Sequence, residues 1–241
     1  MRPELPKQQA MLTRNAIWVF LLLSVATPTA ALGSDQCAGG VVALTFDDGP
    51  QPATAELLDV LKREDLRTTF FVVGQNVERS PEIARRIVAE GHAIASHAHT
   101  HADLTALTGD EVASELQRSQ QAIANVTGVN VDLIRLPYGE GNDEVLRRVS
   151  AMGLEEVIWT VDTRDWTGVS AEDILRAVRS TQSGGVVLMH EAAPHTRAAL
   201  PLIARYLRDN RICAGRLVRT TERMPVDPQF PRAFYVRAEA W

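Results

Sequence analysis

Residues 41–50 read VVALTFDDGP, an apolar run followed by two aspartates and a Gly-Pro turn. The run over residues 41–45 predicts a buried strand, because short continuous apolar stretches are typical of strands covered on both faces. A helix is expected over residues 53–64, where leucines recur on one helical face. The stretch therefore predicts a strand, a turn and a helix, with Asp47 and Asp48 at the end of the strand.

The same alternation continues along the chain without a linker rich in proline, glycine or serine. Further strands are expected over residues 69–73, 92–95, 133–136, 156–161 and 186–189, and helices over residues 81–90, 108–126, 143–152, 171–180 and 197–210. Strands separated by helices favour an α/β fold with a parallel sheet and outer helices, as an incomplete barrel or as an open sheet. In both arrangements a functional site lies at the carboxyl ends of the strands.

The beginning of the chain differs in composition from the rest. Three basic residues precede an apolar run over residues 16–26, and small residues follow it, which is typical of a secretory signal peptide. A retained membrane anchor is the alternative, although the run is shorter than the ~20 apolar residues of a span. We expect residues 1–33 to be the signal peptide, residues 34–40 a lead-in, residues 41–215 the main folded domain and residues 216–241 a C-terminal tail.

Charge and cysteine content indicate the compartment and exclude one class of partner. Without residues 1–33 the chain carries 29 acidic and 22 basic residues, a formal charge of −7, so binding to nucleic acid is not expected. No later stretch is long and apolar enough to span a membrane. We therefore expect a secreted or periplasmic protein. Cys37 and Cys213 would both meet an oxidising environment, and the sequence leaves open whether they pair or stay as buried free thiols.

Two short segments carry the strongest signals for chemistry. Of two adjacent carboxylates, Asp47 and Asp48, one can bind a cation while the other takes a proton from water; a solvated turn is the alternative. Residues 96–101 read SHAHTH, in which His97 and His101 are four residues apart and can face one point. Two imidazoles and one carboxylate form a metal site with open positions, whereas uncommitted surface histidines are the alternative. His99 is expected to point away.

Three further segments, RLPYG at residues 135–139, DTRDW at residues 162–166 and VLMHE at residues 187–191, each follow or end a predicted strand. Each key residue has a structural alternative: Arg135 could pair with a surface acid, Asp162 could cap its loop, and His190 could be a core histidine. Their convergence on one edge of the sheet favours a functional role, because a buried charge without a partner is costly.

With these segments in this order, the sequence resembles the NodB-homology polysaccharide deacetylases, carbohydrate esterase family 4, over residues 41–210. The resemblance implies a single-domain distorted (β/α)7 barrel with parallel strands and outer helices. It also implies a divalent metal, Zn²⁺ in the first place with Co²⁺ or another divalent ion as alternatives, held by Asp48, His97 and His101.

The resemblance further implies a role for each remaining motif residue. Asp47 would be the general base for the attacking water, oriented by Arg135, and the backbone N–H of Tyr138 would stabilise the oxyanion. His190 would be the general acid, hydrogen-bonded to Asp162. The pocket for the acetyl methyl would be lined by Leu188 and Trp166.

One residue departs from the family pattern, which usually has Ser or Thr after the first metal histidine and here has Ala98. The metal loop is therefore expected to be held differently, with help from Thr100. The expected activity is removal of N-acetyl groups from an N-acetylglucosamine-containing saccharide, which is a chitooligosaccharide, peptidoglycan or an exopolysaccharide. Two alternatives remain, an O-acetyl esterase on the same scaffold and a catalytically silent carbohydrate-binding relative.

Overall fold

Seven parallel strands form the sheet that organises the chain, in a computed structural model that describes residues 1, 37–220 and 236–241. The spatial order is β5-β4-β3-β2-β1-β7-β6, so the first strand lies near the centre. The strands are β1 (Gly40–Asp47), β2 (Thr69–Val72), β3 (Ala93–Ser96), β4 (Leu133–Ile134), β5 (Glu155–Glu156), β6 (Val161–Asp162) and β7 (Val186–His190). This curled sheet with outer helices confirms the predicted (β/α)7 fold class.

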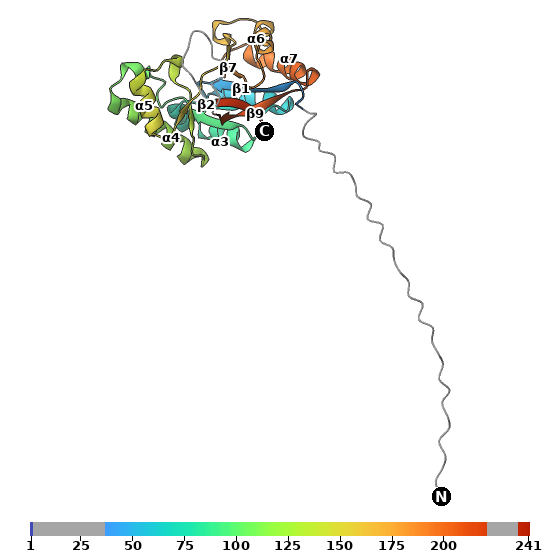
Figure 1. Cartoon of the computed structure of the whole chain (residues 1–241), viewed down its shortest axis with the longest axis horizontal. Helices are drawn as coiled ribbons and strands as arrows, with labels where there is room; N and C mark the ends of the chain where they lie inside the picture. Colours follow the sequence, from blue (N-terminus) through green and yellow to red (C-terminus); the bar gives the residue numbers. More distant parts are fainter. Residues whose placement is uncertain (2–36, 221–235) are drawn as a thin grey trace. The chain divides into compact units, whose positions relative to one another are not determined.

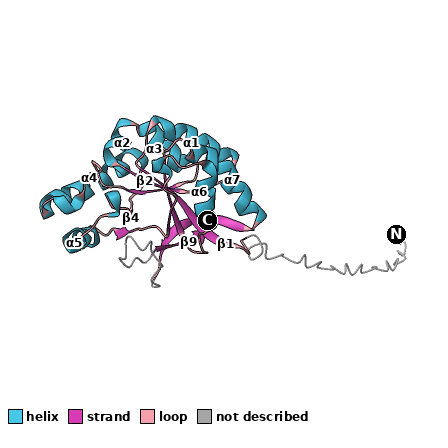
Figure 2. Cartoon of the chain, turned by 90° about the horizontal axis from the view of Figure 1, so that it is seen from above, coloured by secondary structure: helices cyan, strands magenta, loops and turns pink. Residues whose placement is uncertain are grey.

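In the described part of the chain, seven α-helices connect the strands and lie in an arc outside them (Figure 2). They are α1 (Pro52–Arg63), α2 (Gly74–Arg79), α3 (Pro81–Ala89), α4 (Gly109–Thr127), α5 (Asp143–Ala151), α6 (Ala171–Arg179) and α7 (Thr196–Asp209). Single turns of 3-10 helix follow three strand ends, η1 (Leu104–Ala106), η2 (Pro137–Gly139) and η3 (Asp165–Thr167). Among the described residues, no helix is long and apolar enough to cross a bilayer.

Alternation along β1 sorts its side chains between two apolar layers. Leu44 and Phe46 pack into the large cluster between the sheet and the helices, whereas Ala43 belongs to a second cluster on the other face. Because side chains alternate along a strand, Thr45 and Asp47 share the face of Ala43. The end of β1 thus directs one carboxylate toward the inside of the curled sheet.

Two expectations about strands need correction. Residues 156–161 do not form one continuous strand: β5 and β6 are separated by residues 157–160, and Val157, Ile158 and Trp159 are buried in the inner cluster. The expected C-terminal tail over residues 216–241 contains strand structure, because β8 (Ile212–Arg219) pairs parallel with the start of β1 and antiparallel with β9 (Val236–Ala240). In Figure 1 the red β9 lies beside the blue β1.

The expected boundary of the C-terminal tail falls inside a strand. The predicted boundary at residue 215 lies within β8, so the start of the expected tail is continuous with the sheet. The expected signal peptide over residues 1–33 lies outside the described residues apart from residue 1.

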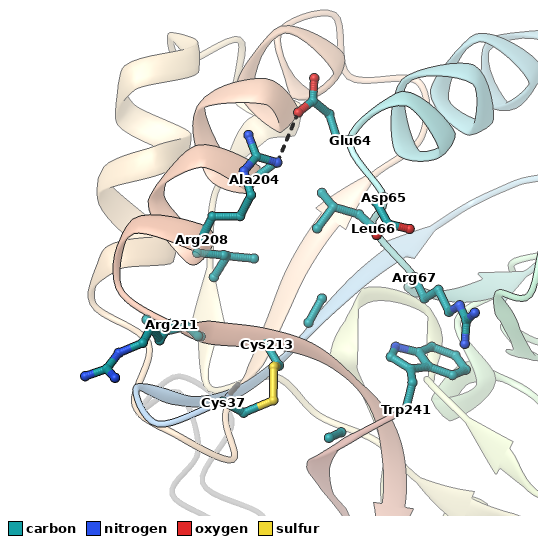
Figure 3. Close-up of a pocket in the computed structure, with 14 residues that line it drawn as sticks. Cys37, Glu64, Asp65, Leu66, Arg67, Ala204, Arg208, Arg211, Cys213 and Trp241 are labelled. Carbon is teal, nitrogen blue, oxygen red and sulfur yellow. Dashed lines mark ion pairs between the residues drawn. A yellow bond between two sulfur atoms is a disulfide. The ribbon is translucent and has the colours of Figure 1, made fainter. Parts of the chain in front are cut away.

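The two cysteines form a disulfide, which decides the question that the sequence left open. Cys37 precedes β1 and Cys213 lies in β8, where it is the register partner of Val41. Figure 3 shows the bond beside a pocket of about 700 Å³ whose lining includes Arg67, Arg208 and Trp241. This pocket lies where β1 begins, at the opposite end of the strand from Asp47.

Candidate active site

Three side chains that follow strand ends come together as a potential cation site. Asp48 follows β1, His97 follows β3, and His101 lies four residues further along the same loop. The Nε2 atoms of His97 and His101 are 3.4 and 3.2 Å from Oδ1 of Asp48, and all three potential ligand atoms lie within 4.8 Å of one another. The structure therefore brings together the three residues that the sequence indicated as metal ligands.

The buried histidine of this group has its orientation fixed by the neighbouring strand. Nδ1 of His97 donates a hydrogen bond to the backbone carbonyl of Arg135 at 2.7 Å, which fixes the ring with Nε2 directed at Asp48. An imidazole oriented in this way, with a second imidazole and a carboxylate beside it, is a donor set that suits zinc and related divalent ions. The residues present thus fit a metal ion.

The electrostatics of the three residues favour a charged carboxylate. Burial raises the pKa of Asp48, but the hydrogen bonds with His101 and His97 lower it by a larger amount in total. The pKa of Asp48 therefore lies well below the usual range. The hydrogen bond with Asp48 raises the pKa of His101, against the opposing effect of burial. Asp48 is consequently ionised at neutral pH and available as an anionic ligand.

The other aspartate of the pair is buried and held by an arginine. Asp47 is only 3% exposed, and its Oδ1 accepts a hydrogen bond from Nη1 of Arg135 at 2.7 Å. Nη1 of Arg135 also donates to Oγ1 of Thr45, its Nε donates to the carbonyl of Val157, and the guanidinium stacks 4.1 Å from the centre of the Phe71 ring.

These contacts leave the second oxygen of Asp47 directed toward the cation site. That oxygen, Oδ2, lies 3.8 Å from Nε2 of His97. The expected pairing of Arg135 with Asp47 is present, so the arginine holds one carboxylate oxygen while the other faces the site.

His190 ends β7 and is the register partner of Asp47 on β1. Its Nδ1 donates to Oδ1 of Asp165 at 2.7 Å, so the assignment of Asp162 as its hydrogen-bonding partner is wrong. Asp162 instead accepts a hydrogen bond from the backbone N–H of Arg164, and Asp165 is fixed through its second oxygen by the hydroxyl of Thr196 and the N–H of His190. The turn between the two aspartates directs the second one back toward β7.

This environment favours the protonated form of His190. Burial lowers its pKa, but the hydrogen bond to Asp165 and the negative charges of Asp47, Asp165 and Asp48 outweigh that effect and raise the pKa to about 9. His190 is therefore protonated at neutral pH and able to donate a proton from Nε2, since Nδ1 is already bonded to Asp165.

Three further predicted residues lie on the loops and strand around this group. Tyr138 is in η2 with a left-handed backbone (φ 60°). Its exposed ring packs edge-on against the ring of His101, with 4.8 Å between the ring centres. Trp166 follows Asp165 in η3 and is 61% exposed, whereas Leu188 is buried in β7, two residues before His190. No measurement tests the roles expected for these three residues, which stay predictions.

A buried glutamate that the sequence did not single out, Glu191, lies next to Gly49, the residue after Asp48. Glu191 is fully buried and accepts a hydrogen bond from the hydroxyl of Thr54. Burial raises its pKa well above the usual range, and the nearby Asp48 and Asp47 act in the same direction. A Cβ at Gly49 would overlap the carboxyl oxygens of Glu191, which explains the glycine between Asp48 and Pro50. The adjacency of Glu191 to His190 was the one signal for it.

A buried carboxylate beside a basic residue, a cluster of cation ligands and a protonated histidine define a class of site that can activate water and protonate a leaving group. A family model described as polysaccharide deacetylase matches residues 35–157. The chain is 41% identical over 154 residues to a chitooligosaccharide deacetylase from Rhizobium leguminosarum bv. trifolii, covering 63% of this chain and 71% of that protein. The chain belongs to the polysaccharide deacetylase family.

Two further similarities bear on the fold and on the range of activities in the family. A family 4 carbohydrate esterase from Streptomyces lividans, solved with acetate, has a TM-score of 0.74 and 39% identity, covering 83% of this chain and 97% of that one. A bifunctional xylanase/xylan deacetylase from Cellvibrio japonicus is 38% identical over 186 residues, which is 76% of this chain. This chain spans only 28% of the length of that xylanase.

Proposed function

We propose that the protein is a metal-dependent hydrolase that removes N-acetyl groups from an N-acetylglucosamine-containing saccharide. The observation that carries the proposal is the meeting of Asp48, His97 and His101 at one point, with Asp47 and His190 paired across β1 and β7 beside it. Amide hydrolysis needs an activated water, stabilisation of the oxyanion and a proton for a poor leaving group. This group of residues offers a candidate for each.

In the proposed mechanism Asp48, His97 and His101 hold the metal ion, in the first place Zn²⁺. When bound, the ion would act as a Lewis acid that lowers the pKa of water and polarises the acetamide carbonyl. Asp47 accepts the proton of the attacking water through the oxygen that Arg135 leaves free.

The second half of the reaction uses the other side of the site. The N–H of Tyr138 donates to the oxyanion, and His190 gives its proton to the amine as the carbon–nitrogen bond breaks, releasing acetate. Leu188 and Trp166 flank the acetyl methyl. Asp165 keeps the imidazole of His190 oriented for this transfer.

A second candidate is removal of O-acetyl groups, because one relative of this chain is named a xylan deacetylase. The same residues could hydrolyse an ester, whose alkoxide leaving group needs less help from a general acid than an amine does. Acetate release from N-acetylated chitooligosaccharides and from acetylated xylan, measured side by side, separates the two. Peptidoglycan and N-acetylated exopolysaccharide are included as further substrates.

Metal analysis of the purified protein, joined to acetate release with and without a chelator, tests the proposal. Asp47→Asn should keep the metal and lose deacetylation, whereas His101→Ala should lose both together. An Asp47→Asn variant that stays fully active would remove the general base from the mechanism. A chelated protein that keeps full activity would remove the metal.

We also propose that the protein acts in the periplasm or outside the cell. The disulfide between Cys37 and Cys213 supports this location, because such bonds persist in oxidising compartments. The apolar segment near the start of the sequence agrees with export. Fractionation of cells that produce the full chain, followed by mass measurement of the recovered protein, tests both export and removal of residues 1–33.

A further inference from the structure

The loop between His97 and His101 has an unusual backbone for a pair of metal ligands. Ala98 and His101 both have left-handed conformations, with φ values of 59° and 62°. Such conformations are disfavoured for residues with a Cβ and persist where the surroundings enforce them. The side chain of Ala98 has no polar atom that could hold the loop, so other groups hold it.

Four backbone groups in the centre of the loop are fixed by hydrogen bonds from outside it. The carbonyls of Ala98 and His99 accept from the N–H groups of Gly74 and Gln75 at the start of α2, at 3.0 and 2.9 Å. The N–H groups of His99 and Thr100 both donate to Oε2 of Glu115, at 3.0 and 2.8 Å. One side of the loop is therefore held by backbone and the other by a single side chain.

Glu115 lies on α4 and is only 8% exposed, and its bond to the N–H of His99 is buried. One turn later on the same face of α4, the hydroxyl of Ser119 bonds that of Ser96 at 2.8 Å. Ser96 directly precedes His97. The helix thus contacts the chain on both sides of the first histidine, which fixes its position relative to α4.

We propose that Glu115 is a positioning residue for the cation site: it holds the loop so that both imidazoles face Asp48. The expected contribution of Thr100 to this loop is present, but through its backbone N–H bonded to Glu115. The inference rests on the proposed function, since it concerns how the proposed metal ligands are oriented. Groups that orient metal ligands typically change metal affinity by about 10- to 100-fold when removed.

Replacing Glu115 by alanine removes the acceptor that the N–H groups of His99, which is buried, and Thr100, which is exposed, share in the wild type. Glu115→Ala is expected to raise the zinc dissociation constant at least tenfold, measured by competition with a chromophoric chelator. Glu115→Gln keeps a side-chain carbonyl of the same reach and is expected to stay within about threefold of the wild type. Gln117→Ala, an exposed position on the same helix, is the matched control and should bind zinc as the wild type does.

A second measurement separates loop order from metal binding. Hydrogen exchange of a peptide covering residues 97–101 in the metal-free protein should accelerate in Glu115→Ala and stay near the wild type in Glu115→Gln. Should Glu115→Ala fail to fold, Glu115→Asp, whose shorter side chain cannot reach both N–H groups, takes its place.

The outcomes are distinct from those that test the proposed function. A folded Glu115→Ala protein whose zinc dissociation constant lies within threefold of the wild type overturns the inference. A Glu115→Gln protein whose zinc affinity falls as far as that of Glu115→Ala also overturns it. A wild-type protein that binds no zinc refutes the metal site itself. In that case unchanged exchange in Glu115→Ala would also refute the role of Glu115 in ordering the loop, whereas faster exchange would retain it.

Discussion

Replacing Arg135 by methionine should destabilise the protein strongly, because it leaves Asp47 buried without its counter-charge. The guanidinium is fully buried and donates to Asp47, Thr45 and the Val157 carbonyl. Removing one partner of a buried ion pair costs about 3–5 kcal/mol, mostly through the charge left behind. We expect the free energy of unfolding to fall by that amount.

A double-mutant cycle makes this prediction specific to the pair. Asp47→Asn alone should also destabilise, since it leaves a buried guanidinium without a carboxylate, and the combined variant should lose less than the sum of the two. The assay is urea unfolding of the metal-free, disulfide-bonded protein at neutral pH, followed by tryptophan fluorescence. Arg147→Met removes a solvent-exposed ion pair to Glu144 and should leave stability nearly unchanged.

Two results would refute the reasoning about this pair. One is a loss below about 1 kcal/mol for Arg135→Met, which would mean that water or a rearrangement satisfies Asp47. The other is strict additivity in the cycle, because contacting residues that share a hydrogen bond show interaction energies of about 0.5–3 kcal/mol.

Three further predictions concern other parts of the site and fold. Asp165→Asn should lower the pKa of His190 from about 9, so the alkaline loss of deacetylase activity should begin at lower pH than in the wild type; an unshifted pH profile would contradict the role of Asp165. Gly49→Ala should reduce bound metal and soluble yield together, because the new methyl overlaps the carboxyl of Glu191. Replacing both disulfide cysteines by alanine should lower the free energy of unfolding by about 5 kcal/mol, because the bond closes a loop with a sequence separation of 176 and the chain-entropy model relates stabilisation to loop length. Urea unfolding measures this loss, and a value under about 1 kcal/mol would contradict the prediction.

Protonation of His190 also contributes to the stability of the folded protein. The folded-state pKa of His190 is raised above its ordinary value of 6.5, so the protonated form stabilises the folded protein. This contribution is fully present below about pH 6.5 and is lost as pH rises through about 9. A bound cation would reduce the contribution of Asp47 and Asp48 but not the hydrogen bond to Asp165, so the metal-loaded protein should still show the shift that Asp165→Asn produces.

Most of the residues that the sequence expected to meet, and that the structure brings together, lie directly at strand ends. Asp47, Asp48 and His97 follow buried apolar runs, and parallel strands bring their carboxyl ends to one edge. Arg135 and His190 obey the same rule. Fold class follows from the same regular alternation of strands and helices, which is a local property of the chain.

The residues that the sequence missed depend on the paths of turns and on contacts between distant elements. Between Asp162 and Asp165 the chain passes through a left-handed residue, Arg164 (φ 56°), and this turn decides which aspartate reaches His190. Strand and helix periodicity carry no information about such a turn. Glu115 resembles any glutamate on an amphipathic helix until α4 is placed against the loop between His97 and His101.

Left-handed backbone conformations of non-glycine residues gather around the proposed reaction centre: Asp48, Ala98, His101 and Tyr138 all have φ values between 59° and 80°. Each costs of order 1–3 kcal/mol, which the surrounding fold must supply. Laboratory evolution toward heat resistance should therefore split into two classes. Changes in the outer helices can add stability freely, whereas changes that relax these four residues would add stability and lose turnover.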